Sequence, residues 1–267
     1  MDAPVKSSQK RDRATGKALP HDSAHLHVSG RAAYTDDIPE PRGLLHLAVG
    51  MSAKPHAKIT HIDFSDVVES PGVVDVCAAA DIVGENNYGP IVKDDPVFAD
   101  GLVQYVGQPV FAVAATTVEA ARKAARKADI EYQELEPILD PLTAVEKQSF
   151  VLPSETLVRG DPDDALDASP RRLKRRVMLG GQDQFYLEGH VAMVVPEEDG
   201  VLRVYSSTQH PDEVQRLVAH ATDRTAKDVV CICRRMGGAF GGKESQAATI
   251  ACLAAVMAVR TGQPCTL

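Results

Sequence analysis

The sequence VVCICRRMGGAFGGKESQAATIACLAAVMAVRTG occupies residues 229–262 and falls into three parts. A short apolar run from Val229 is typical of a strand, a glycine-rich turn follows, and a long apolar run closed by Gly262 is typical of a helix. The first N–H groups of a helix lack partners within the helix and carry partial positive charge. The turn at residues 237–242 therefore predicts a place where backbone amides approach a ligand, an anion above all. The alternative is a tight strand-to-helix corner.

A second segment follows the same plan with the sequence VLRVYSSTQHPDEVQRLVAHA, residues 201–221. Its first residues alternate as in a strand with one buried face, and the chain turns at Gln209. Pro211 suits the first position of a helix. An apolar stripe at helical spacing follows, formed by Val214, Leu217, Val218 and Ala221. Both turns are thus expected at the N-terminus of a helix.

The first half of the chain mixes short strands with helices. Apolar runs of strand length at residues 44–51, 73–78 and 109–115 predict strands. Because these runs are apolar on both faces, we expect the strands to be covered on both sides. Together with the second half, this pattern predicts an α+β fold.

One helix of the first half is predicted over residues 117–128. Thr116 and Glu119 have the spacing of a capping box at its start. The face opposite the apolar stripe is basic, and a polybasic binding surface is one interpretation. A solvated face is the simpler one, because Glu119 and Lys123 form a favourable pair one helical turn apart.

Composition divides the chain into three parts. Residues 1–18 form a basic tail that we expect to be disordered. Residues 19–148 form a first domain and residues 149–267 a second. The boundary lies near residue 150, where prolines and glycines punctuate an acidic stretch.

The charge balance argues against nucleic acid as a partner. The chain has a formal net charge of −8 and a pI near 5.6, and we identify no basic face outside the first residues. A surface that binds phosphates needs clustered Lys and Arg. Nor do we expect a membrane association, because the longest apolar stretch, residues 247–259, is shorter than the roughly 20 residues of a membrane span.

The cysteines and the N-terminus predict a cytoplasmic protein. The N-terminal residues have no apolar core of a secretory signal. The five cysteines are odd in number and lack the spacing of zinc or redox sites, so we interpret them as reduced, buried thiols. They are Cys77, Cys231, Cys233, Cys252 and Cys265.

A phosphate-binding loop is one alternative for the glycine-rich turn. Gly237 and Gly242-Lys243 match such a loop loosely, after a strand and before a helix. The next residue does not match, because Glu244 stands where Ser or Thr would ligate Mg²⁺. We therefore regard nucleotide binding as the weaker interpretation.

Three motifs resemble a known family. GGQDQFYLEG (residues 180–189), SSTQHP (206–211) and RRMGGAFGGKES (234–245), in this order, closely resemble the molybdopterin-binding subunit of bacterial xanthine dehydrogenases, in the xanthine oxidase family of molybdenum hydroxylases. PHDSAHLHVSGRAAYTDDIP (20–39) and VGQPVFAVAA (106–115) resemble the α/β hammerhead domain that precedes it. The resemblance implies a hammerhead domain over residues 19–148, followed by the first part of a mixed α+β molybdenum-cofactor-binding domain.

The resemblance also implies roles for individual residues. Gln209 corresponds to a glutamine that hydrogen-bonds an oxo ligand of the molybdenum, and an amide N–H donor suits such a group. Gly238, Phe240 and Gly241 correspond to loop residues at the cofactor. Glu244 corresponds to the catalytic-site glutamate that binds and orients the purine. None of these residues would ligate the metal directly.

Other residues near these motifs have simpler interpretations. We expect Phe185 and Tyr186 to belong to the hydrophobic core. His190, His210 and His220 are isolated in sequence and have no partner at the spacing expected of a metal site.

The implied function is the hydroxylation of hypoxanthine and xanthine to urate at a molybdenum–molybdopterin centre, with NAD⁺ as final electron acceptor. The resemblance implies that FAD and iron–sulfur clusters lie on a separate small subunit, and the absence of a cysteine cluster that could hold an iron–sulfur centre agrees with this division. Glu244 favours purines, since aldehyde oxidases share GGAFGGK but generally lack this glutamate. An aldehyde oxidase relative and an assembly module that docks the small subunit remain alternatives.

The sequence ends at GQPCTL, where another strand begins by its pattern. The resemblance places a general-base glutamate and most cofactor contacts further along the family's sequence. We therefore expect the chain to be an N-terminal fragment that does not turn over substrate alone. We also expect an uncovered apolar face on the helix after Glu244.

Overall fold

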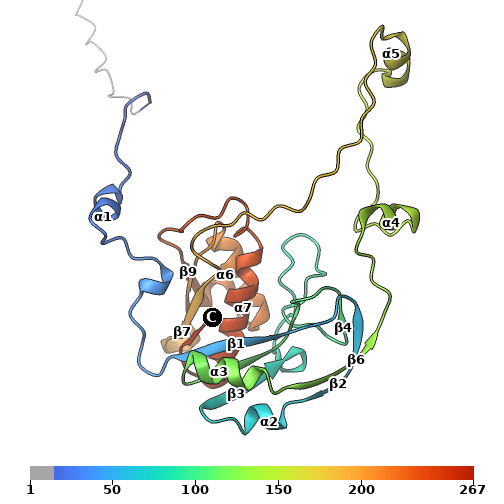
Figure 1. Ribbon diagram of the computed structural model, residues 1–267. Helices are drawn as coiled ribbons and strands as arrows, with labels where there is room; N and C mark the ends of the chain where they lie inside the picture. The colour runs from blue at the N-terminus through green and yellow to red at the C-terminus, as the bar shows by residue number, and fades with distance from the viewer. Residues whose placement is uncertain (1–14) are drawn as a thin grey trace, which may run out of the picture.

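A computed structural model describes residues 15–267 of the chain (Figure 1). The disordered tail predicted over residues 1–18 lies almost entirely outside the described residues. Seven strands form one sheet in the order β3 (Val73–Ala78), β5 (Pro109–Ala115), β1 (Leu45–Met51), β10 (Cys265–Thr266), β7 (Ala192–Pro196), β8 (Leu202–Ser206) and β9 (Val229–Ile232). A smaller sheet has the order β4 (Leu102–Val103), β2 (Ala57–Asp63) and β6 (Asp129–Glu134). The mixture of sheets and helices confirms the α+β prediction.

The short strand β10 joins the two halves of the large sheet. Leu45 of β1 is paired in parallel with Cys265, and Val194 of β7 is paired antiparallel with the same residue. The hammerhead strands and the strands of the second half therefore share one continuous sheet. The pattern of GQPCTL predicted this strand correctly.

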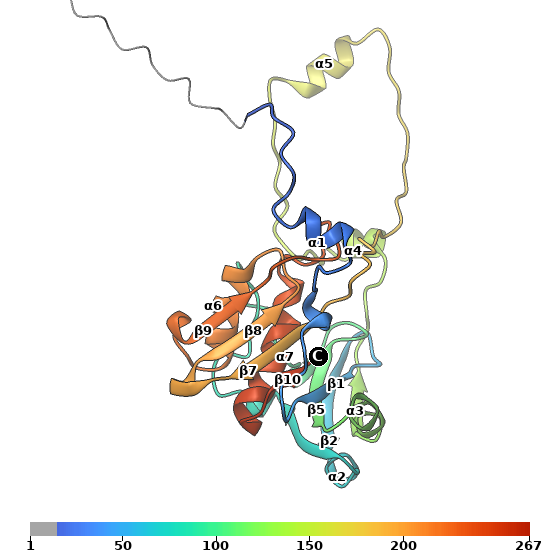
Figure 2. The same ribbon diagram turned by 90° about the vertical axis from the view of Figure 1, so that its left-hand side faces the viewer.

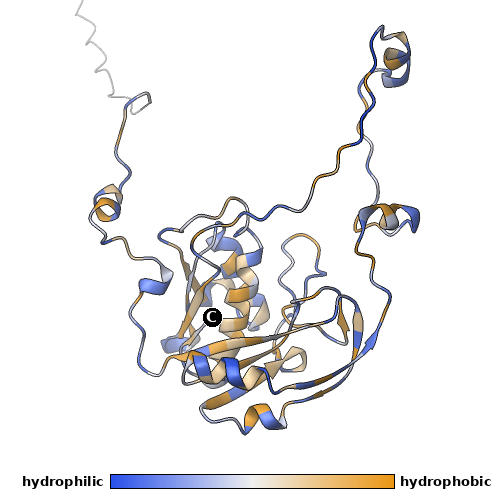
Figure 3. Cartoon of the chain, in the orientation of Figure 1, coloured by the Kyte–Doolittle hydropathy of each residue, from blue (hydrophilic) through white to orange (hydrophobic). Residues whose placement is uncertain are grey.

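The core of the second half is built around helix α7 (Gln246–Thr261). Ten of its residues are buried, including the run from Ala251 to Ala258, because α7 packs on strands β7, β8 and β10 and on helix α6 (Pro211–Ala221). Figure 3 shows this helix as apolar along its length inside the fold. The expected uncovered face on α7 is therefore wrong: the sheet and α6 cover it within this chain. Gly262 ends the helix in the left-handed conformation, as predicted.

Most predicted elements of the first half are confirmed, with small shifts. Strands β3 and β5 have the predicted bounds, and helix α3 (Val118–Ala125) ends three residues early. The helix cap is Thr117, whose side chain accepts from the Ala120 N–H, so the predicted capping box at Thr116 is wrong. Coverage on both faces holds for β5 but not for β3, because β3 is an edge strand and exposes Val74.

The remaining helices lie at the margins of the body. They are α1 (Ala24–Val28), α2 (Ser65–Val68), α4 (Pro141–Glu146) and α5 (Pro162–Ala168). Residues 137–190, with α4 and α5, leave the body as a long arm and return to it (Figures 1 and 2). Among residues 15–267 there is no helix that is both long and apolar enough to cross a membrane.

The arm corrects one interpretation of the sequence. Residues 171–176 read RRLKRR and are exposed, so a basic face does exist outside the first residues. An acidic helix, α5, precedes this run, and Arg172 pairs with Asp167 at 3.2 Å. The negative charge of α5 therefore partly offsets the positive charge of residues 171–176.

Candidate functional site

The two turns predicted at helix N-termini meet at Gln209. The Gln209 backbone N–H donates to the Lys243 carbonyl at 2.9 Å. The side-chain oxygen of Gln209 accepts from the Gly241 N–H at 3.1 Å and from the Lys243 N–H at 3.3 Å. Because backbone N–H groups can only donate, the amide oxygen must face them. The Gln209 Nε2 group is left as a donor, and within residues 15–267 it has no hydrogen-bond acceptor.

The glycine-rich turn presents its tip to solvent. Gly238 and Gly241 have φ values of 98° and 93°, a conformation that side chains with a Cβ rarely adopt. Phe240 between them also has a positive φ, 53°, and its side chain is 75% exposed. A non-glycine residue held in this region stores backbone strain, which tends to occur where function requires it. A Cβ built on Gly241 would meet no atom within 4 Å, so the turn leaves open space beside its amide.

Glu244 follows this turn and is exposed. Two residues later α7 begins at Gln246. Lys243, the residue before Glu244, is buried instead: its side chain is 0% exposed. The structure thus brings Gln209, Phe240 and Gly241 into one local unit and leaves Glu244 accessible at its margin.

A buried ion pair holds the glycine-rich turn in place, and this ion pair was not predicted from the sequence. The Lys243 ammonium lies 3.1 Å from Glu188 Oε2 and donates to Ser207 Oγ at 2.7 Å. Glu188 Oε2 also accepts from Ser207 Oγ at 2.6 Å and from the Gly237 N–H at 2.7 Å. The pair therefore ties three segments together: the 180–189 motif, the end of β8 and the glycine-rich turn.

The same contacts exclude the phosphate-loop role of Lys243. In such a loop the lysine reaches outward to phosphate oxygens. Here its ammonium is enclosed by Glu188, Ser207 and the ring of Tyr186, whose centroid lies 4.8 Å from Nζ. The weaker interpretation of residues 237–243 is therefore wrong.

Glu188 is held in its ionised form despite its burial. Desolvation by itself raises the pKa of this carboxyl group. The hydrogen bonds from Gly237, Ser207 and Lys243, together with the charge of Lys243, outweigh desolvation, and the net pKa lies below its ordinary value of 4.5. The carboxylate therefore contributes stability that is present above pH 4.5 and is lost as pH falls through the lowered pKa.

This linkage predicts a pH-dependent difference between the wild-type chain and Glu188→Gln. At pH 6–7 the wild-type chain should have the larger free energy of unfolding. The difference should begin to shrink as pH falls below about 4.5 and should be lost as pH falls through the lowered pKa, where Glu188 of the folded protein becomes protonated. Urea unfolding followed by circular dichroism at several pH values measures it. A difference that stays constant down to the acid transition would contradict the ionised state of Glu188.

Aromatic residues beside the pair correct the core prediction. Phe185 is 91% exposed, so its assignment to the hydrophobic core is wrong. Tyr186 is half-buried, and a Cβ on Gly242 would approach its Cε1 to 2.4 Å, so this glycine allows the turn to pack against the ring. His190 is integrated as well, with Nε2 at 2.9 Å from both Tyr186 OH and the Gly242 carbonyl.

The cysteines form no disulfide; all five thiols are free. Burial raises the pKa of Cys77, Cys231, Cys252 and Cys265 to about 12 each, so these thiols stay protonated. Within residues 15–267 no group of three or more His, Cys, Asp or Glu side chains could hold a metal ion. The polar groups described at the turn are the Gln209 amide, the exposed Glu244 carboxylate and backbone N–H groups.

Family models match nearly the whole described chain. Residues 29–136 match "Aldehyde oxidase and xanthine dehydrogenase, a/b hammerhead domain" and residues 145–267 match "Molybdopterin cofactor-binding domain". Among curated proteins, xanthine dehydrogenase of Drosophila pseudoobscura pseudoobscura is 40% identical over 93% of this chain and 19% of its own length. Aldehyde oxidase 2 of Rattus norvegicus is 38% identical over 98% of this chain and 19% of its own length. The chain thus spans about a fifth of the length of these relatives.

Solved structures share the fold. The aldehyde oxidoreductase of Desulfovibrio gigas superposes with a TM-score of 0.80 at 24% identity, over 93% of this chain and 29% of its own. Quinoline 2-oxidoreductase of Pseudomonas putida 86 gives 0.78 at 22% identity, over 94% of this chain and 34% of its own. The arrangement of a hammerhead domain followed by a cofactor-binding domain is confirmed.

Proposed function

The chain belongs to the xanthine oxidase family of molybdenum hydroxylases, and we propose that it supplies one wall of the active site of a xanthine dehydrogenase. That enzyme would convert hypoxanthine and xanthine to urate with NAD⁺ as final electron acceptor. A small subunit with FAD and iron–sulfur clusters would be its partner, and the free cysteines support a cytoplasmic setting.

The observation that carries this proposal is the orientation of the Gln209 amide. Two backbone N–H groups bind its oxygen, so the orientation of the amide is fixed and its Nε2 group remains available as a donor to a ligand. A preoriented donor suits an oxo group of a molybdenum–molybdopterin cofactor. The open space beside Gly241 and the exposed ring of Phe240 fit a bulky group at the same place.

Each residue would then have a distinct task. The cofactor, when bound, supplies the oxidising centre at which a ring carbon acquires oxygen from water. Gln209 would hold the cofactor's orientation through Nε2, while Gly238 and Gly241 let the turn approach it closely. Phe240 would pack against its apolar side and exclude water. Glu244 would accept hydrogen bonds from N–H groups on the purine edge.

The substrate assignment depends on Glu244 and can be tested separately from the cofactor. In the enzyme assembled with this chain, we expect Glu244→Gln to lower kcat/KM for xanthine about 10–100-fold, because a charged hydrogen bond to substrate is lost. Oxidation of benzaldehyde should change less than about threefold, since an aldehyde has no N–H edge. Urate absorbance and aldehyde consumption measure the two rates.

The matched control is Glu198→Gln, an exposed carboxylate in the turn between β7 and β8, which should leave both rates unchanged. Equal losses on xanthine and benzaldehyde would assign Glu244 a structural role. Rapid benzaldehyde oxidation without xanthine turnover in the wild type would favour the aldehyde oxidase alternative. Purified enzyme without molybdenum would overturn the proposal itself.

A further inference from the structure

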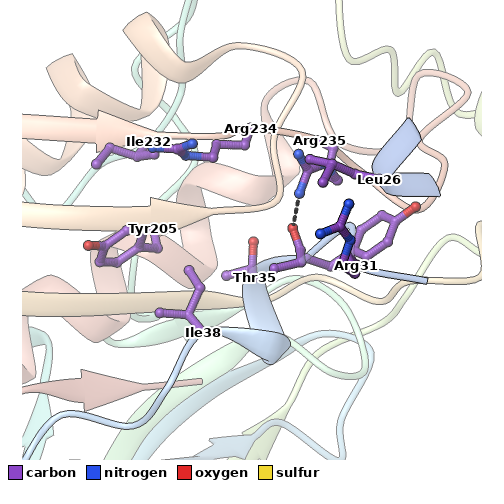
Figure 4. Close-up of a pocket in the computed structure, with 10 residues that line it drawn as sticks. Leu26, Arg31, Thr35, Ile38, Tyr205, Ile232, Arg234 and Arg235 are labelled. Atoms are coloured by element: carbon purple, nitrogen blue, oxygen red, sulfur yellow. Dashed lines mark hydrogen bonds between the residues drawn. The ribbon is translucent and has the colours of Figure 1, made fainter. Parts of the chain in front are cut away.

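A cavity of about 350 Å³ lies between the N-terminal segment and the edge of the large sheet (Figure 4). Its walls come from residues 26–38 on one side and from β8, β9 and the two arginines after β9 on the other. Such a volume is within the range of small-molecule sites in proteins. None of the proposed active-site residues lines it.

The cavity is cationic. Arg31, Arg234 and Arg235 line it, and no carboxylate does. None of these three guanidinium groups forms an ion pair with an acidic side chain of residues 15–267. The net charge of the chain is −8, so three arginines around one cavity, without ion-pair partners among residues 15–267, make it a local region of positive charge.

Arg235 is preoriented for an anion. Its Nη1 donates to the Ala33 carbonyl at 2.5 Å, which fixes the side chain against the N-terminal segment. Its Nε is buried and has no hydrogen-bond partner among residues 15–267. A buried donor without a partner costs about 1–3 kcal/mol. Because Nε is closed to a ligand, an anion in the cavity would be bound by the terminal N–H groups of Arg235, which suit a carboxylate or a phosphate.

The remaining wall is apolar and aromatic. Leu26, Ile38 and Ile232 supply aliphatic surface, and Tyr34 and Tyr205 supply rings. Figure 4 shows Arg31 beside Arg235 at one end, with Ile38 and Tyr205 toward the other. A ligand with an acidic group at one end and an apolar ring at the other matches this division.

We propose that this cavity is a second binding site, specific for a small organic anion that carries a carboxylate or a phosphate on an apolar, ring-containing body. The acidic group binds Arg31 and Arg235, and the ring lies against Ile38 and Tyr205. Because this site shares no residue with the proposed active site, its test is independent of the molybdenum chemistry.

Binding of defined probes to the purified protein tests the proposal. Benzoate and phenyl phosphate have the required pattern, benzyl alcohol lacks the charge, and inorganic phosphate lacks the ring. Isothermal titration should give each aromatic anion at least about tenfold tighter binding than benzyl alcohol, because charge-assisted hydrogen bonds are lost in the alcohol. Tighter binding of benzoate indicates a carboxylate ligand, and tighter binding of phenyl phosphate indicates a phosphate ester.

Variants distinguish binding in this cavity from nonspecific attraction of the anion to arginine side chains elsewhere on the protein. Arg235→Gln and Arg31→Gln should each weaken phenyl phosphate binding about tenfold. Arg31 is useful because, among residues 15–267, the only hydrogen bond of its side chain is to exposed Ser29, so its replacement is expected to leave the fold intact. Arg216→Gln, on the exposed side of α6, is the matched control. Equal binding of benzyl alcohol, unchanged binding in both cavity variants, or no binding to the wild type would each overturn the proposal.

Discussion

Replacing Lys243 with methionine is expected to lower the free energy of unfolding by about 3–5 kcal/mol. Methionine is unbranched and only one heavy atom shorter than lysine, so most of the loss comes from the missing charge rather than from a cavity. Glu188 would keep its negative charge in a buried place without the ammonium 3.1 Å away, and Ser207 would lose its donor. Guanidinium chloride unfolding, followed by circular dichroism, measures this change.

Two further variants make this result interpretable. Lys123→Met breaks an exposed pair with Glu119 and should cost less than about 0.5 kcal/mol. Combining Lys243→Met with Glu188→Gln removes the stranded charge, so the double variant should be more stable than the sum of the single losses implies. Additive losses, or a loss below 1 kcal/mol for Lys243→Met, would mean that the pair does not support the turn.

The largest effect on turnover is expected at Gln209. In the enzyme assembled with this chain, Gln209→Ala should reduce kcat about 10²–10³-fold, the usual cost of one preoriented donor at a reacting centre. Gln209→Glu separates its two roles. The glutamate still accepts from Gly241 and Lys243 but no longer donates, so turnover should fall while the turn stays ordered.

Hydrogen exchange provides the readout that does not depend on activity. The Gly241 and Lys243 amides should exchange faster in Gln209→Ala and remain protected in Gln209→Glu. Gln133→Ala, an exposed glutamine on β6, should change neither turnover nor exchange. Full turnover in both Gln209 variants would rule out the proposed donor role, whatever the exchange rates.

Local sequence patterns predicted the elements that depend on periodicity. The alternation of Leu202, Val204 and Ser206 gave β8 its buried face, and the stripe from Val214 to Ala221 gave α6 its own. Patterns failed where a neighbour decides burial. The sequence of β3 resembles that of a central strand, but its place at the sheet edge depends on pairing with β5, which is distant in sequence. The sequence also failed to predict that the apolar face of α7 is covered, because the elements that pack on this helix could not be inferred from its own sequence.

The site was predictable where a residue's role follows from its backbone position. The glycine-rich turn and Gln209 both precede helices, and the structure places them in contact. The pair of Glu188 and Lys243 was not predictable, because 55 residues separate its members and no motif indicates which way a side chain points. The available signal was a lysine that directly follows the glycine-rich turn. Phe185 failed in the opposite direction: an aromatic residue in a motif was taken for core, but its backbone turns it outward at a φ of 46°.

Strand β10 also bears on how this protein acquires its fold. The bridge between β1 and β7 consists of residues 265 and 266, so the large sheet stays in two separate pieces until the ribosome has released that part of the chain. Pairing over more than 200 residues carries a large entropic cost of loop closure and slows folding. During synthesis β1 therefore has an unpaired edge, and strands with unpaired edges tend to form non-native pairs.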